Sequence, residues 1–109
     1  MWFIFPQIRG LGFSETSKFY AIKNKSEATE YLNHEILGPR LIEISTELLK
    51  LHSFNSVEIF GNTDSLKLKS SMTLFSQLES ENPVFQKVLD KFFGGRKDEK
   101  TIQLLNSNL

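Results

Sequence analysis

Apolar side chains recur three and four positions apart along most of the chain, which is the spacing of a helix that buries one face. The clearest case runs from Leu37 to Leu51, where Leu or Ile returns at steps of four, three, four and three. Because proline is well tolerated in a first turn, Gly38-Pro39 marks the start of this helix. The pattern predicts a long helix over 39–52, with Leu51 on its buried stripe.

A second long helix is predicted over 63–79, where Leu68, Met72, Phe75 and Leu78 are helically spaced. Thr63 or Asp64 would cap it, and Val57, Ile59 and Phe60 would form a short turn before it. Polar caps and glycine stops predict the shorter helices: 15–21 after Ser14, 27–33 after Ser26, 84–93 between Asn82-Pro83 and Gly94-Gly95, and a last one around Ile102, Leu104 and Leu105.

No segment alternates apolar and polar residues as a half-buried strand does. The pattern therefore predicts an all-α fold, a compact orthogonal domain of about five to six helices, two of them long, over 1–109. Ten Phe favour a dry, bulky core. Its predicted members are the five apolar residues Leu48, Phe75, Phe85, Val88 and Leu89.

The formal net charge is zero, from 13 basic and 13 acidic side chains, so the overall field offers nucleic acid no attraction and none is expected as a partner. The absence of cysteine excludes disulfides and thiolate metal sites. No apolar run approaches the roughly 20 residues of a bilayer span. We expect a cytoplasmic protein with no membrane partner and no cofactor.

Two groups of residues have the side chains that an anion site requires. Near the N-terminus, Trp2 could stack on a ring, Gln7 and Arg9 could bind polar or anionic groups, and the backbone at Gly10 could approach a phosphate. In the second long helix, Lys67, Ser70 and Ser71 lie three and four positions apart on one side, with Lys69 and Thr73 beside them. Arg96, after Gly94-Gly95, could bind a carboxylate or phosphate in two-pronged fashion.

Each group also has a purely structural interpretation. The N-terminal aromatics could belong to the core, the Lys and Ser side chains could form a solvated helix face, and Arg96 could make a surface ion pair. The two histidines, His34 and His52, are too far apart in sequence to suggest a metal site. His34 is expected to hold the turn before Gly38 by hydrogen bonds or to line a pocket, and His52 to contact carbonyl groups at the end of its helix.

Several long motifs, in order, resemble a bacterial and fungal family of unknown function. They are MWFIFPQ at 1–7, RGLG at 9–12, LGPRL at 37–41, LKLKSSMTLF at 66–75 and FFGGR at 92–96. The resemblance implies a mainly helical domain with an uncommon fold. Genome labels sometimes name such proteins calpastatin, but that inhibitor is disordered, and ten helically spaced Phe contradict disorder.

Members of this family carry another helix upstream of the MWFIFPQ motif, whereas the first residue here is the Met of that motif. We therefore expect a domain without this N-terminal helix, whose exposed aromatic run at 2–5 favours a homodimer.

Two functions remain open. The first is binding, or acting on, a small anionic, nucleotide-like molecule between the N-terminal loop and the 67–73 helix. The second is a protein–protein interaction module that uses exposed Phe from the N-terminal run or from Phe92 and Phe93. The residues do not distinguish an enzyme from a binding protein.

Overall fold

The structure is a computed structural model of the chain and describes residues 22–52, 55–78 and 82–107. These residues form five helices and no strand, which confirms the all-α prediction. The predicted helix over 15–21 lies outside the described residues. The helices are α2 (Lys25–Asn33), α3 (Leu37–Leu49), α4 (Ser56–Ser76), α5 (Val84–Phe93) and α6 (Glu99–Ser107).

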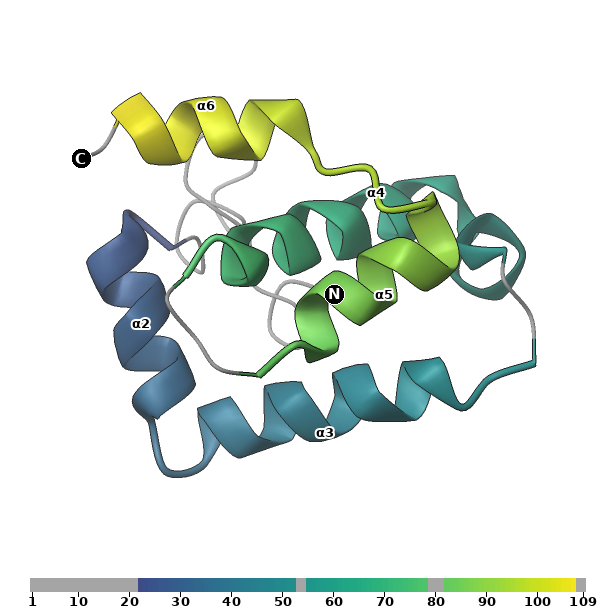
Figure 1. Cartoon of the computed structure of the whole chain (residues 1–109), viewed down its shortest axis with the longest axis horizontal. Helices are drawn as coiled ribbons and strands as arrows, with labels where there is room; N and C mark the ends of the chain where they lie inside the picture. The colour runs from purple at the N-terminus through teal and green to yellow at the C-terminus, as the bar shows by residue number, and fades with distance from the viewer. Residues whose placement is uncertain (1–21, 53–54, 79–81, 108–109) are drawn as a thin grey trace.

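Helix α4 lies at the centre of the arrangement, with α6 on one side and α3 on the other (Figure 1). Helix α5 packs against both α4 and α3, and α6 packs against α4. Helix α2 stands crosswise to α3 and contacts it at the short connection between the two helices. Between α5 and α6, residues 70–75 of α4 are all buried.

The core forms where α4 meets α5. The rings of Phe75 and Phe85 lie 5.4 Å apart between centroids, and Tyr31 of α2 adds a third ring 5.7 Å from Phe75. All five predicted core residues, including Leu48 of α3, are buried, as predicted. Burial also raises the pKa of the Tyr31 phenol above its ordinary value, because the charged form would lose hydration.

Helices α2 and α3 are joined by a turn that side chains stabilise at both ends. The cap of α2 is Asn24 rather than the predicted Ser26: its Oδ1 accepts the Glu27 N–H at 2.9 Å, and the helix begins before Ser26. The His34 Nδ1 accepts the backbone N–H groups of Ile36 and Leu37 at 3.1 and 3.2 Å. Since these are the otherwise unpaired donors of a first turn, α3 starts two residues earlier than predicted.

Helix α4 begins at Ser56, so Val57, Ile59 and Phe60 belong to its first part and not to a turn. Two features explain the difference. The Asn55 Oδ1 accepts the Glu58 N–H at 3.2 Å and caps the helix upstream. Gly61 then adopts a positive φ of 82°, which interrupts the helix and redirects the chain before it resumes.

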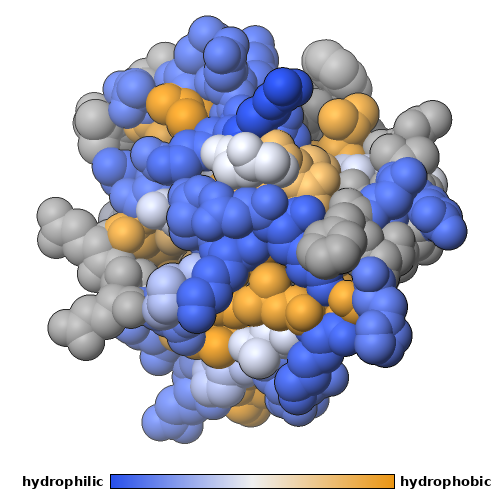
Figure 2. All heavy atoms as spheres, turned by 45° about the vertical axis from the view of Figure 1, so that its right-hand side comes forward, coloured by the Kyte–Doolittle hydropathy of each residue, from blue (hydrophilic) through white to orange (hydrophobic). Residues whose placement is uncertain are grey.

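Helix α3 ends at Leu49 and not at the predicted residue 52. Leu51 lies beyond this end and is 40 % exposed, which corrects its predicted place on the buried stripe. The buried residues of this helix follow a different line: Gly38, Leu41, Ser45 and Leu48. Leu37, Ile44 and Leu51 form a second line, seven residues apart, that runs beside the first. Figure 2 shows a face on which hydrophilic side chains predominate and apolar ones form small separate areas.

Candidate functional site

One side of α4 carries three of the predicted site residues in order of increasing burial. At 100° per residue, Lys67, Ser70 and Ser71 fall within one arc of the helix. Lys67 is partly exposed, Ser70 is 6 % exposed and Ser71 is fully buried. This side therefore has a cation at its rim and two hydroxyls inside.

The two hydroxyls differ in their hydrogen bonds. The Ser70 Oγ donates to the carbonyl oxygen of Leu66 at 3.0 Å, one turn back in the same helix. The Ser71 Oγ is buried and has no hydrogen-bond partner. Leaving such a group unpaired costs about 1–3 kcal/mol, and most buried side-chain hydroxyls in proteins avoid that cost. Among the described side chains of this helix, Ser71 is thus the polar group that the fold itself does not explain.

Thr73, on another side of α4, has a structural role. Its Oγ1 donates to the Lys69 carbonyl oxygen at 2.8 Å and accepts the Asp98 backbone N–H at 2.8 Å. The Asp98 Oδ2 in turn accepts the N–H and the hydroxyl of Thr101, which caps the start of α6. The Thr73 hydroxyl therefore links the residue before α6 to α4.

Arg96 is exposed on the connection between α5 and α6, two residues before Asp98. Its backbone N–H donates to the Phe93 carbonyl oxygen at 3.1 Å, after Gly94 has ended α5 in the left-handed conformation. Thr73 thus contacts the α5–α6 connection, which contains Arg96. This contact is on a different side of α4 from Ser71. Trp2, Gln7, Arg9 and Gly10 lie outside the described residues, so their approach to α4 stays a prediction.

Phe92 and Phe93 do not form the exposed patch predicted for an interaction module. Phe92 is 9 % exposed and belongs to the core, and Phe93 is partly buried against it. The reason is the wide apolar stripe of α5, which is covered by α3 on one side and α4 on the other. The large apolar side chains that are exposed among the described residues are Ile36, Leu37, Leu51 and Leu66.

The two histidines are not part of a metal cluster in the described part of the chain, where no group of three or more metal-ligating side chains occurs. His34 has the turn-holding role given above. The carbonyl groups at the end of α3 are bound by Lys91 of α5, whose Nζ donates to Leu48 and Leu49 at 3.0 Å each and also to Leu51. Nothing in the sequence pattern around Lys91 indicated this contact across more than forty residues.

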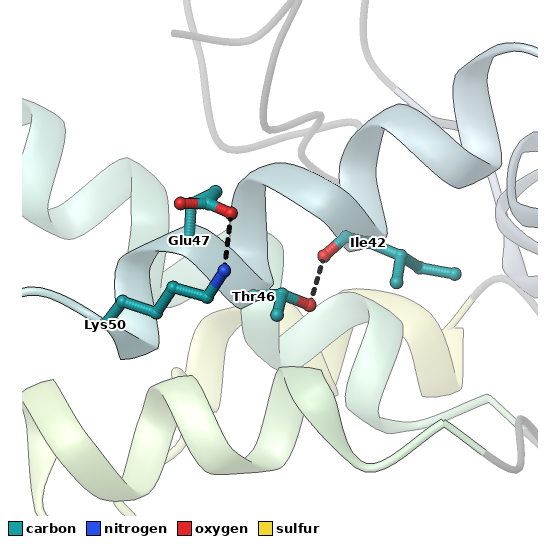
Figure 3. Close-up of polar contacts among 4 residues, drawn as sticks. All are labelled: Ile42, Thr46, Glu47 and Lys50. Carbon is teal, nitrogen blue, oxygen red and sulfur yellow. Dashed lines mark hydrogen bonds and ion pairs between the residues drawn. The ribbon is translucent and has the colours of Figure 1, made fainter.

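Sequence reasoning also missed a groove along α3 with a volume of about 550 Å³. Among the described residues it is lined by side chains of α3 and by Leu51 just after its end: Arg40, Glu43, Ile44, Glu47, Leu48 and Leu51. Figure 3 shows the polar edge of α3, where the Lys50 Nζ lies 2.9 Å from the Glu47 Oε1 and the Thr46 Oγ1 donates to the Ile42 carbonyl oxygen at 2.7 Å. The seven-residue spacing of Ile44 and Leu51 was the sequence signal for the apolar part of this groove.

None of the helices among the described residues is both long and apolar enough to cross a membrane. No curated protein matches the chain. Among solved structures, the conserved hypothetical protein Rv1873 from Mycobacterium tuberculosis is similar, with 45% identity and a TM-score of 0.93 over 96% of this chain and 75% of that one. Residues 1–105 match a family described as protein of unknown function, DUF1810, and this chain belongs to that family.

Proposed function

We propose that this protein binds a small anionic, nucleotide-like molecule, in a site that joins the N-terminal segment to the 67–71 side of α4. The observation that supports the proposal is the buried, unpaired hydroxyl of Ser71. The other proposed contacts are Trp2, Gln7, Arg9, Gly10, Lys67, Lys69, Ser70 and Arg96.

The chemistry of the α4 side suits an oxyanion. A phosphate or carboxylate oxygen can accept the unused Ser71 proton, and a hydrogen bond to a charged group is among the stronger ones in proteins. Ser70 already donates within its helix, so it would contribute a lone pair to a ligand hydroxyl. Lys67, nearer the solvent, would supply positive charge at the entrance.

The N-terminal residues would complete the recognition of a nucleotide. The indole of Trp2 offers a flat apolar face for a base, and Arg9 offers a planar pair of donors for a phosphate. Lys69 and Arg96 lie toward other parts of the α4 surface, and the substitutions Lys69→Ala and Arg96→Ala would measure their share of the anion affinity.

The test compares ligand-induced stabilisation in wild type and Ser71→Ala. AMP and inorganic phosphate are titrated into the full chain while the melting temperature and the heat of binding are recorded. A ligand at 100 times its Kd stabilises a protein by about 2.7 kcal/mol, which raises the melting temperature of a domain this size by roughly 10 °C or more. We expect AMP to raise the melting temperature of wild type, and this rise to be lost in Ser71→Ala.

Ser45→Ala is the matched control, because Ser45 is also fully buried and its hydroxyl faces only the Met72 sulfur at 3.8 Å. Removing the unpaired Ser71 hydroxyl should leave the unliganded protein at least as stable as wild type, so a lost response cannot be attributed to unfolding. A wild type that responds to neither AMP nor phosphate would contradict the proposal, and so would a Ser71→Ala variant that responds as wild type does.

A role as an interaction module is the second candidate. Phe92 and Phe93 do not support this role, because Phe92 is buried and Phe93 partly buried. The observation that favours an interaction module is the exposure of Leu37 and Leu51 at the α3 groove.

A further inference from the structure

Along the groove side of α3, apolar residues recur every seven positions, and so do charged residues. Leu37, Ile44 and Leu51 form the apolar row. The two ends of that row are 36 % and 40 % exposed, and Ile44 between them is partly buried against the core. Arg40 and Glu47 are likewise seven positions apart, are both exposed, and follow one edge of the row. At 100° per residue, seven residues within a helix return a side chain to within about 20° of its starting direction, so Leu37 and Ile44 share one line and Arg40 and Glu47 another. Leu51 follows the end of α3 by two residues, and it lines the same groove as Ile44.

This arrangement is self-complementary when two copies of the helix run antiparallel. With a twofold axis at Ile44, the residue seven positions before it faces the residue seven positions after it in the other copy. Leu37, about 10 Å from the axis, then lies near Leu51 of the second copy, and Ile44 lies near Ile44. The twofold rotation therefore covers both exposed ends of the apolar row, Leu37 and Leu51.

The same axis also brings opposite charges together. Arg40 lies four residues before Ile44 and Glu47 three residues after it, which is about 6 and 4.5 Å along the helix. In an antiparallel pair related by a twofold axis, the same edge of each helix faces the other. Arg40 of one copy therefore lies beside Glu47 of the other, twice in the dimer. Glu43 and its copy are furthest from the apolar row, toward solvent.

We propose that the α3 groove is the site at which a second copy of this chain docks, helix against antiparallel helix, with Ile44 on the twofold axis. This surface on α3 is independent of the anion site proposed on α4. A foreign peptide of one charge has no advantage here, because Arg40 and Lys50 balance Glu43 and Glu47 along α3. The antiparallel copy matches both the charges and the apolar spacing.

The area available predicts a weak dimer. Stable interfaces bury about 800 Å² on each partner, whereas α3 has 13 residues and is only about 20 Å long. We expect a dissociation constant on the order of 10–1000 µM, so that monomer and dimer exchange in solution. Sedimentation equilibrium of the full chain from about 10 µM to 1 mM covers this range.

A charge-swap series tests the geometry. Arg40→Glu places two acids side by side in each contact and Glu47→Arg two bases, so each single variant should weaken the dimer by about tenfold or more. The double variant Arg40→Glu/Glu47→Arg restores opposite charges in every contact and should dimerise within about threefold of wild type. Restoration by the second substitution is a result that damage to the fold would not produce.

Lys100→Glu is the matched control, since it makes the same charge change as Arg40→Glu on an exposed position of α6, which lies across α4 from α3 (Figure 1). It should dimerise as wild type does. A wild type that stays monomeric up to 1 mM overturns the proposal, as does a dimer insensitive to both single charge reversals or one that the double variant fails to restore.

Discussion

At the scale of single residues, Gly38 determines how closely α2 and α3 approach. A Cβ atom at this position would lie 1.9 Å from the carbonyl oxygen of Leu32 and 2.7 Å from its carbonyl carbon. Both neighbours are backbone atoms, so no side chain can rotate to make room. Glycine here is required by packing and not by backbone conformation, because Gly38 has ordinary helical angles within α3.

We predict that Gly38→Ala destabilises the protein by about 3 kcal/mol, even though alanine favours a helix by about 1 kcal/mol over glycine. The added methyl group must push α2 away from α3, which opens the contacts of Ala28 with the core. Urea unfolding followed by circular dichroism measures the loss. Glu43→Ala, an exposed change in the same helix, should alter stability by less than about 0.5 kcal/mol. Equal stability of the two variants would contradict this role of Gly38.

At the scale of elements, the ends of α3 depend on groups outside the helix. His34 accepts N–H groups of its first turn, and Lys91 donates to carbonyl oxygens of its last turn. A lysine at a helix C-terminus also interacts favourably with the helix dipole. Because Lys91 belongs to α5, it additionally ties α5 to α3, and its Nζ lies 5.1 Å from the centroid of the Phe92 ring.

Replacing Lys91 by methionine keeps the length of the side chain and removes its charge and donors. We predict a loss of about 1–2 kcal/mol, because the three carbonyl groups lose a charged donor at a partly exposed site. Hydrogen exchange should show faster opening of the last turn of α3 in this variant. Lys87→Met, an exposed lysine of the same helix, is the control and should leave both stability and exchange unchanged. A matching loss in the control would contradict the capping role.

At the scale of the whole molecule, the packing of α4 against α5 unites the helices into one core. Phe75 and Phe85 are buried at the contact, and α3 and α6 each add one side to it. The structure of the mycobacterial relative, with a TM-score of 0.93 at 45% identity, has the same arrangement. The arrangement is therefore shared by two chains that differ at more than half of their aligned positions.

Phe85→Ala should lower the free energy of unfolding by about 3–5 kcal/mol, since it removes a fully buried ring and leaves a cavity between α4 and α5. That is a large part of the stability of a small domain. Phe93→Ala makes the same truncation at a partly buried position of α5 and should cost clearly less. Melting temperatures of both variants provide the measurement, and a Phe85→Ala protein that melts within a degree of wild type would disprove the assignment of the core.

The helices and most of the core follow from local sequence, because three-and-four spacing, capping residues and glycine stops act within a few residues of one another. Val84–Phe93 was predicted to the residue for this reason. Residue types alone also indicate the segment 67–73 as a candidate site, and this interpretation stays a prediction.

Tertiary structure decided which of these features matter, since each depends on partners far away in the chain. Whether the Ser71 hydroxyl finds a partner, whether Leu51 is covered and which cation binds the end of α3 are set by neighbouring helices. Three-and-four spacing marks a broad apolar face, and it cannot distinguish the line of Leu41 and Leu48, which α5 and α2 cover, from the parallel line of Leu37, Ile44 and Leu51. Only the packed molecule buries the first line in the core and leaves Leu37 and Leu51, the two ends of the second, exposed.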